Sequence, residues 1–312
     1  MSPESKVAVK VENRQLTLSN LDKVLYPEVG FTKGQVIDYY TRIAPVMLPH
    51  IKDRPLTFKR YPDGVDGKFF FEKNAPSHAP PWVRRVELPS PGSTKNRSTI
   101  KYAVVGELPA LVWAANLATL EMHVPMWRVQ KNGKPKNPDV MVYDLDPGEP
   151  ATIVECCEVA QLVRTALDKV GIEAYPKTSG SKGMQLYVPL DAKRPWQDVH
   201  AYARELAEQL EEEHPDLVVS NMKKELRGGK VLVDWSQNNS AKTTIAPYSL
   251  RARALPTVST PITWHEVEGC RKPTDLRFTA DDVLDRVQAQ GDLFAPVLDG
   301  GPSLPAANGR RR

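Results

Sequence analysis

The stretch "VMVYDLDPGEP" (Val140–Pro150) ends an apolar run with two aspartates and a Pro-Gly turn. Alternate side chains of a β-strand share one face, so the even-numbered residues of this run form a row that changes from valine to aspartate. Asp144 and Asp146 form the acidic end of that row. Two carboxylates this close repel each other unless a cation lies between them. Solvated residues at a strand end are the alternative, and the pair alone does not decide the matter.

The segments after this strand predict a split β-α-β-β-α-β unit. Thr152 and Glu155 form a capping box that opens a helix, and Gly171 closes the helix as its C′ residue. The following runs predict a strand in "IEAYPKT", a strand in "MQLYVPL", a helix over Trp196–Glu213 and a strand in "KVLVDW" (Lys230–Trp235). This order of elements is typical of a ferredoxin-like sheet.

The last strand of this unit also ends in an aspartate, Asp234. In a ferredoxin-like sheet the first and last strands can lie close enough to share a site. Three convergent carboxylates suit a pair of Mg²⁺ or Mn²⁺ ions, the arrangement used for in-line phosphoryl displacement. The pattern therefore predicts Asp144, Asp146 and Asp234 as ligands of two metal ions.

Two polar loops accompany the aspartates. In "TSGSKGMQLY" (Thr178–Tyr187) the glycines let backbone N–H groups approach an anion, and Ser179, Ser181 and Lys182 add donors for a triphosphate. The loop lacks the spacing of a Walker A motif, and an ordinary hairpin loop is the alternative. The second loop, "SQNNSAKTTIAPYSLRARALP", follows Asp234 and carries cations that could neutralise phosphates. These cations are Lys242, Arg251 and Arg253, and for Arg253 a solvated basic loop is a serious alternative.

The N-terminal half gives a weaker pattern. Thr32 and Gln35 form a capping box, so a helix is expected to begin near Lys33. Residues 52–138 alternate short strand-like runs with loops, and "LPALVWAANLATLEMHVPMW" reads as a buried helix that leads into a strand. We predict one domain over residues 1–294, with an N-terminal module at about 1–138 and a catalytic sheet at about 139–255. The Pro-, Gly- and Arg-rich tail, 295–312, is expected to be disordered.

Composition excludes several classes of protein. The chain of 312 residues has 42 Lys and Arg against 38 Asp and Glu, and this net charge of +4 permits a polyanionic partner without requiring one. Only three cysteines occur, two of them adjacent, so neither a disulfide framework nor a Cys-x-x-Cys zinc site is expected. The sequence has no apolar run near the roughly 20 residues of a membrane span and no secretory signal. We expect a cytoplasmic protein that has no contact with a membrane.

Six motifs together resemble the polymerase domain of bacterial ligase D, in the archaeo-eukaryotic primase superfamily. They are "LDKVLYP", "FFEK", "LEMHVP", "YDLDPGE", "TSGSKGMQLYVPL" and "KVLVDWSQNNSAKTTIAPYSLRAR", and the resemblance runs from about Leu16 to Phe294. It implies an α+β primase-polymerase fold, in which a central ferredoxin-like or RRM-like sheet carries the catalytic aspartates beside an N-terminal α/β module. It also implies a preference for Mn²⁺ over Mg²⁺ and the ability to insert ribonucleotides.

The resemblance assigns further roles. His123, in an apolar setting typical of a core histidine, would instead contact the incoming nucleotide, and Phe70 and Phe71 would stack on template bases. Lys23 and Lys33, with Asn20 close by, would bind a downstream 5′-phosphate. The implied nucleotide-binding residues are His123, Ser179, Ser181, Lys182, Gln185, Lys242 and Arg251. Gln185 stands where many relatives have His.

The expected function is a template-dependent, stand-alone and monomeric nucleotidyltransferase that acts on nucleoid DNA. It would extend primer 3′ ends at gaps or double-strand breaks that carry a 5′-phosphate. Its substrates would be nucleoside triphosphates, and its partners a DNA ligase and an end-binding protein. A primase that starts chains de novo is one alternative. A non-catalytic DNA-end-binding module that recruits a ligase is the other.

Overall fold

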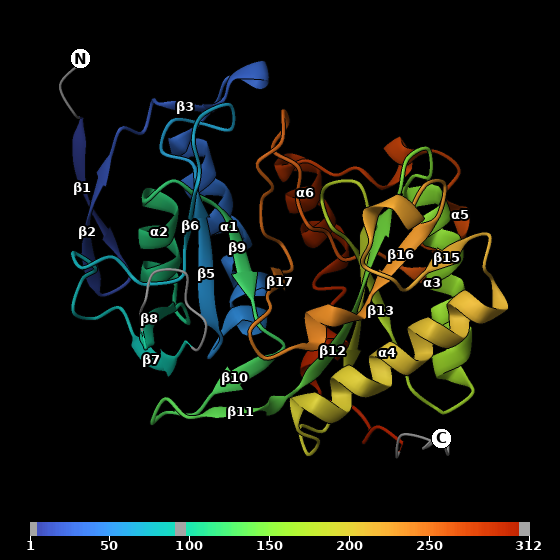
Figure 1. The fold of residues 1–312 in the computed structure, drawn as a ribbon. Helices are drawn as coiled ribbons and strands as arrows, with labels where there is room; N and C mark the ends of the chain where they lie inside the picture. Colours follow the sequence, from blue (N-terminus) through green and yellow to red (C-terminus); the bar gives the residue numbers. More distant parts are fainter. Residues whose placement is uncertain (1–4, 91–97, 306–312) are drawn as a thin grey trace.

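The acidic stretch forms β12 (Val140–Pro147), the middle strand of a five-stranded sheet, in a computed structural model that describes residues 5–90 and 98–305 (Figure 1). The strand order is β13-β14-β12-β16-β15, and the first three pairs are antiparallel. The other strands of the sheet are β13 (Tyr175–Thr178), β14 (Met184–Pro189), β16 (Val231–Asp234) and the short β15 (Val218–Val219), and β12 pairs directly with β14 and β16. This confirms the ferredoxin-like unit.

Two helices cover one face of this sheet. α3 (Ile153–Asp168) begins after the predicted Thr152 capping box, and α4 spans Trp196–Glu213 as predicted. Alternate residues of β12, from Met141 to Leu145, pack with both helices in one apolar core, which also buries both adjacent cysteines. The even-numbered residues face the other way, where Val140 and Val142 pack in a separate core with Met126, Tyr187 and Phe294. The row therefore brings its aspartates out on the face opposite α3 and α4.

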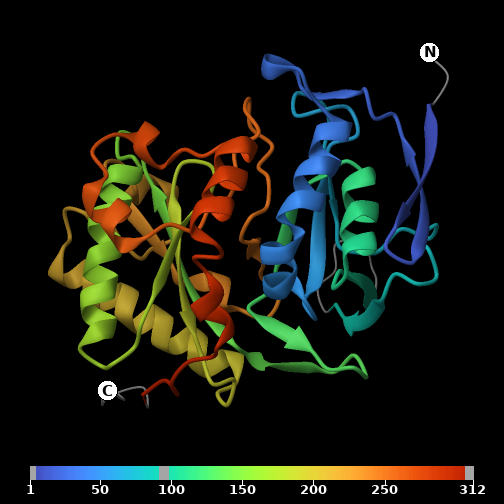
Figure 2. The same ribbon diagram turned by 180° about the vertical axis from the view of Figure 1, so that it is seen from behind.

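A second sheet organises the N-terminal lobe, which lies beside the first sheet in both views (Figures 1 and 2). Its order is β17-β9-β5-β8-β7, with β6 paired to β5. α1 (Lys33–Ile51) begins at the predicted residue behind its Thr32 capping box, and the buried helix α2 (Leu108–Asn116) leads into β9 as predicted. The strands are β5 (Pro55–Arg60), β6 (Phe70–Glu72), β7 (Arg85–Pro89), β8 (Thr99–Val104), β9 (Thr119–Val124) and β17 (Thr244–Ile245).

Smaller elements complete this lobe. A hairpin of β1 (Lys6–Val11) and β2 (Arg14–Ser19) precedes the short pair β3 (Val24–Tyr26) and β4 (Phe31–Thr32). A two-stranded ribbon, β10 (Trp127–Val129) with β11 (Pro135–Pro138), leads into β12. No helix within the described residues is long and apolar enough to span a bilayer.

The chain crosses between the lobes a second time after β16. β17 adds to the edge of the N-terminal sheet by pairing with β9, and the chain then returns to α5 (Trp264–Gly269) and α6 (Ala280–Gln290). The hydroxyl of Tyr39 on α1 donates to the carbonyl of Tyr248, which ties the crossing segment to the first lobe. The predicted boundary near residue 138 falls between β11 and β12, but β17 shows that the two modules share a sheet.

The start of the C-terminal tail is ordered, and the prediction of disorder is wrong for residues 295–305. A short 3-10 helix (Ala295–Leu298) packs beside β14, and the side chains of Val297 and Leu304 are buried. Ser303 donates a hydrogen bond to Asp191. Two apolar anchors thus hold a segment whose composition is typical of disorder. Residues 306–312 lie outside the described part of the chain.

Candidate active site

Cross-strand register brings the predicted aspartates together. Asp144 on β12 lies opposite Asp234 on β16 and, on its other side, opposite Gln185 on β14. Directly opposed residues of an antiparallel pair have Cβ atoms about 5 Å apart and point to the same face. Asp146 follows two residues later on that face, and it is exposed whereas Asp234 is buried. The register of the strands therefore places the three aspartates on one face of the sheet, as predicted.

Neighbouring side chains hold two of these carboxylates. The Nε2 of Gln185 donates to Oδ1 of Asp144 at 3.0 Å. Asp234 caps a short 3-10 helix, η3 (Trp235–Asn238), because its Oδ1 accepts from the backbone N–H of Ser236 at 2.9 Å. Its Oδ2 accepts from Nε2 of Gln237 at 2.7 Å. Gln185, predicted to contact the nucleotide, therefore contacts Asp144 in this structure.

The electrostatics of this surface favour a bound cation. Burial, with the charge of Asp146 as the next cause, raises the pKa of Asp144 to about 7. Although Asp146 is more exposed, desolvation of its carboxyl group and the charge of Asp234 also raise its pKa. A divalent ion would relieve this repulsion, and carboxylate oxygens are the ligands that Mg²⁺ and Mn²⁺ prefer. The residues therefore fit such an ion, although across residues 5–90 and 98–305 no three acidic, histidine or cysteine side chains already form a closed ligand cluster.

The glycine-containing loop between β13 and β14 is held by its own serine. The Oγ of Ser179 accepts from the backbone N–H groups of Ser181 (3.2 Å) and Gly183 (3.3 Å). Gly180 has φ +68°, and a Cβ there would lie 2.7 Å from the carbonyl oxygen of Val258. Only glycine fits this conformation and this close approach. Lys182 is exposed and pairs with Glu149 at 2.6 Å.

The basic residues after β16 surround the same surface. Lys242 is exposed, and its Nζ lies 3.4 Å from the Oγ of Ser236, which itself donates to Asp234. Arg251 reaches the glycine loop, because its guanidinium donates to the carbonyl of Ser179 at 3.1 Å. Arg253 is exposed. Lys242 and Arg251 thus approach the predicted site from the aspartate side and from the loop side.

His123 and the phenylalanines meet at the edge of the N-terminal sheet. The ring centroids of His123 and Phe71 are 5.9 Å apart, and Nε2 of His123 lies 2.9 Å from Oε2 of Glu121. Burial lowers the pKa of His123. Phe69, Phe70 and Phe71 are each more than half exposed and form an aromatic patch. An alternating strand would expose only one of Phe70 and Phe71, so this exposure favours a surface that receives a ligand.

Asn20, Lys23 and Lys33, for which a common role is predicted, line one cavity of about 500 Å³ in the N-terminal lobe. Arg60, His78 and Trp82 line it too. Lys23 is partly exposed and pairs with Asp63 at 2.9 Å. Lys33 is buried, and its Nζ donates to the carbonyl of Ser19 at 2.6 Å. Lys33 is therefore not a solvated surface lysine.

The sequence patterns did not identify three further residues at the site. Glu121 could have been found, because an i, i+2 pair with His123 in a strand shares one face. Lys177 on β13 lies opposite Gln185, is fully buried and donates to the Oγ of Ser259 at 2.5 Å. Gln237 contacts Asp234. Nothing in the local sequence distinguishes Lys177 or Gln237 from ordinary strand and loop residues.

An acidic row on a ferredoxin-like sheet, faced by a glycine loop and converging cations, is the arrangement expected in the primase-polymerase class of proteins. The chain belongs to the family of the LigD primase-polymerase domain, whose model matches residues 32–294. It resembles the polymerase domain of Mycobacterium tuberculosis ligase D in complex with DNA, with a TM-score of 0.86 and 44% identity over 93% of this chain and 100% of that one.

Longer curated proteins are also similar. The multifunctional non-homologous end joining protein LigD of Mycolicibacterium smegmatis is 48% identical over 283 residues, which are 91% of this chain and 36% of that protein. The bifunctional non-homologous end joining protein LigD of Bacillus subtilis is 33% identical over 281 residues, 90% of this chain and 44% of that protein. The chain thus spans less than half the length of these relatives.

Proposed function

We propose that the chain extends primer 3′ ends on a DNA template, at short gaps or double-strand breaks, with two Mn²⁺ or Mg²⁺ ions held by Asp144, Asp146 and Asp234. One observation carries this proposal: the aspartates share one sheet face in register, where burial and, after it, the neighbouring carboxylate charges raise the pKa of Asp144 to about 7. Such repulsion costs stability in the free protein, so its persistence indicates a site built for a cation.

The protein's own groups position these ligands. Gln185 orients Asp144, and Ser236 with Gln237 orients Asp234, so two of the three carboxylates are fixed by hydrogen bonds to neighbours. Bound ions would activate the primer 3′-hydroxyl and stabilise charge on the phosphorus under attack and on the departing pyrophosphate. Hydrogen-bonded neighbours of this kind hold ligands in place before a metal arrives.

The nucleotide would lie between the aspartates and the glycine loop. Ser179, Ser181 and Lys182 would meet its triphosphate from the loop, and Lys242 and Arg251 would neutralise its remaining charge. His123 would contact the same nucleotide from the N-terminal sheet. The positions of Lys242 beside Ser236 and of Arg251 against Ser179 support this arrangement.

DNA would lie along the N-terminal lobe. Phe70 and Phe71 would stack on template bases, a role that suits their exposed rings. Asn20, Lys23 and Lys33 would bind a downstream 5′-phosphate in their shared cavity. The M. tuberculosis structural relative is a complex with DNA, and the curated relatives are named for non-homologous end joining. We therefore assign the chain, as a monomer, to end joining beside a DNA ligase and an end-binding protein.

Primer extension on gapped DNA tests this function. Mg²⁺ and Mn²⁺, each with ribo- and deoxynucleotides, should be compared in parallel on gapped, recessed and unprimed templates. The proposal predicts metal-dependent addition at the gap and none on the unprimed strand. Synthesis on the unprimed strand would instead indicate a primase. DNA binding without nucleotide addition under every condition would leave only an end-binding module.

A further inference from the structure

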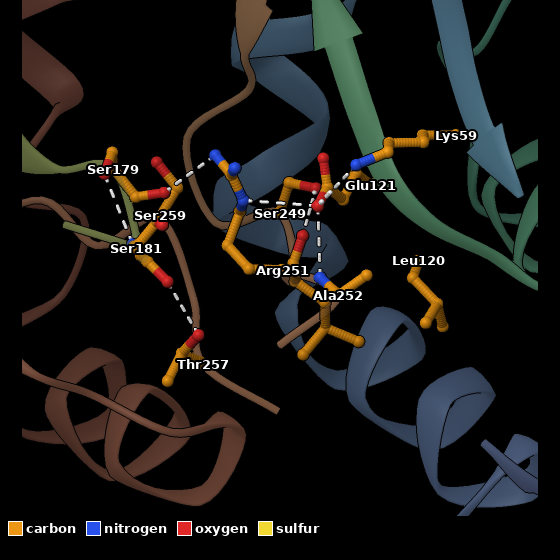
Figure 3. A network of polar contacts seen from close by, with 12 residues as sticks. Lys59, Leu120, Glu121, Ser179, Ser181, Ser249, Arg251, Ala252, Thr257 and Ser259 are labelled. Atoms are coloured by element: carbon orange, nitrogen blue, oxygen red, sulfur yellow. Dashed lines mark hydrogen bonds and ion pairs between the residues drawn. The ribbon is translucent and has the colours of Figure 1, made fainter. Parts of the chain in front are cut away.

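Glu121 on β9 is a buried carboxylate on which basic side chains from separate segments converge (Figure 3). Its Oε1 lies 3.6 Å from Nζ of Lys59, on β5, and 3.3 Å from Nε of Arg251, in the segment after β17. Its Oε2 lies 2.9 Å from Nε2 of His123. The backbone N–H of Ala252 also donates to Oε1 at 3.1 Å. Both carboxylate oxygens are therefore occupied.

This carboxylate is ionised despite its burial. Burial alone would raise the pKa of Glu121, but the hydrogen bond from His123 and the charges of Arg251 and Lys59 lower the pKa to about 2. A buried charge persists only where it is paired and hydrogen-bonded, so the surrounding side chains and Glu121 depend on one another.

The three partners of Glu121, which are Lys59, His123 and Arg251, each also contact a different part of the candidate site. Arg251 lies between Glu121 and the glycine loop, where it donates to the carbonyl of Ser179 (Figure 3). The ammonium of Lys59 lies 4.6 Å from the ring centroid of Phe69. His123 lies beside Phe71. Glu121 therefore links the loop that would bind the triphosphate with the aromatic patch that would receive the template.

We propose that Glu121 is a positioning residue of the nucleotide site, which holds Lys59, His123 and Arg251 in the arrangement that meets an incoming nucleoside triphosphate. This inference rests on the proposed function. Glu121 itself would not contact the substrate, since a buried anion would repel a triphosphate. It acts by fixing three long or rotatable side chains that would otherwise lose their geometry.

The test uses two changes at this position. Glu121→Gln keeps the shape and removes the charge, and Glu121→Asp keeps the charge and withdraws it by one methylene group. Positioning predicts that both raise the KM for the templated nucleotide, and the Kd for ATP with Mn²⁺ in the absence of DNA, by about tenfold to a hundredfold. The Kd for gapped DNA should stay close to that of wild type. Glu266→Gln, which removes another ion-paired glutamate that caps α5, is the matched control and should leave the KM unchanged.

The alternatives give different results. If the charge of Glu121 merely opposed the triphosphate, Glu121→Gln would bind ATP more tightly and Glu121→Asp would match wild type, and either result would overturn the inference. A purely structural role would lower the melting temperature and weaken ATP and DNA binding together, which also overturns it. Because Glu121→Asp retains the ion pairs in weakened form, it decides the question if Glu121→Gln does not fold. A wild-type protein that neither binds ATP nor extends primers would refute the proposed function instead.

Discussion

Asp144 on β12 and Asp234 on β16 are direct cross-strand partners, with Asp146 on the same face of the sheet. The β-α-β-β-α-β order produces this contact, because it places the first and last long strands of the unit side by side. Like charges directly opposed on a sheet are destabilising. The pair is therefore better explained by a ligand that binds both residues than by any contribution to the stability of the free protein.

Divalent metal should stabilise the wild-type protein, and Asp144→Asn should cancel that effect. A ligand at 100 times its Kd adds about 2.7 kcal/mol to the free energy of unfolding. The asparagine removes one source of repulsion, so it should raise the melting temperature without metal while abolishing the shift caused by Mn²⁺. Thermal unfolding with and without Mn²⁺ measures both effects. An equal Mn²⁺ shift in wild type and variant would show that Asp144 is not a ligand.

Removing the rings of the aromatic patch should impair template handling more than nucleotide binding. Stacking is worth roughly 1–3 kcal/mol per base, so Phe70→Ala or Phe71→Ala should weaken DNA binding and leave the KM for the nucleotide nearly unchanged. Val170→Ala, at an exposed valine just beyond α3, is the control for loss of a surface apolar group. Wild-type DNA affinity and fidelity in both phenylalanine variants would argue that the patch has no role in DNA binding.

The lysine cavity should confer a preference for a downstream 5′-phosphate. Wild type should bind gapped DNA more tightly when the 5′-phosphate is present, and Lys23→Ala should lose that preference and lower the salt slope by about 1. Lys33 is buried, so Lys33→Met is the better change there because it keeps the volume. Asp63→Asn should strengthen the preference, since Asp63 pairs with Lys23. Equal wild-type affinity for both ends would exclude the pocket.

Glu121 should make stability depend on acid pH. Its pKa falls from 4.5 to about 2 in the folded protein, so its contribution is fully present above about pH 4.5 and is lost as the pH falls toward 2. The shift corresponds to about 3 kcal/mol, of which about 2 kcal/mol should be lost between pH 6 and pH 3. Urea unfolding at these two values should show a smaller loss in Glu121→Gln. The same loss in both proteins would contradict the shifted pKa.

Local patterns predicted much of the second half of the fold and the first helix of the N-terminal lobe. The capping boxes at Thr32 and Thr152 marked helix starts, and the alternation in β12 showed which residues leave the core together. Long-range pairing could not be read in this way, because β17 has only two residues and pairs with a strand far away in the sequence. The tail was predicted from its Pro and Gly content, yet Val297 and Leu304 find apolar partners that composition does not reveal.

In the candidate site, too, residues in local motifs were predicted, and residues brought in by long-range contacts were not. Its aspartates and glycine loop stand in short motifs, so the sequence alone was enough to single them out as candidates. The spacing of Glu121 from His123 offered a local signal, but its other partners, Lys59 and Arg251, come from separate segments that the sequence does not bring together. Lys177 was missed for the same reason, since only the register of β13 with β14 places it across from Gln185.

The most direct measurement is single-nucleotide addition to a primer on gapped DNA with Mn²⁺, by wild type and by Asp144→Ala, Asp146→Ala and Asp234→Ala. Circular dichroism and gapped-DNA affinity should confirm that each variant is folded. A two-metal site formed by these aspartates predicts addition by wild type and none by any variant, because loss of a ligand removes the metal and the charge stabilisation that it supplies. Activity within about tenfold of wild type in any folded variant would contradict the assignment of that aspartate as a metal ligand.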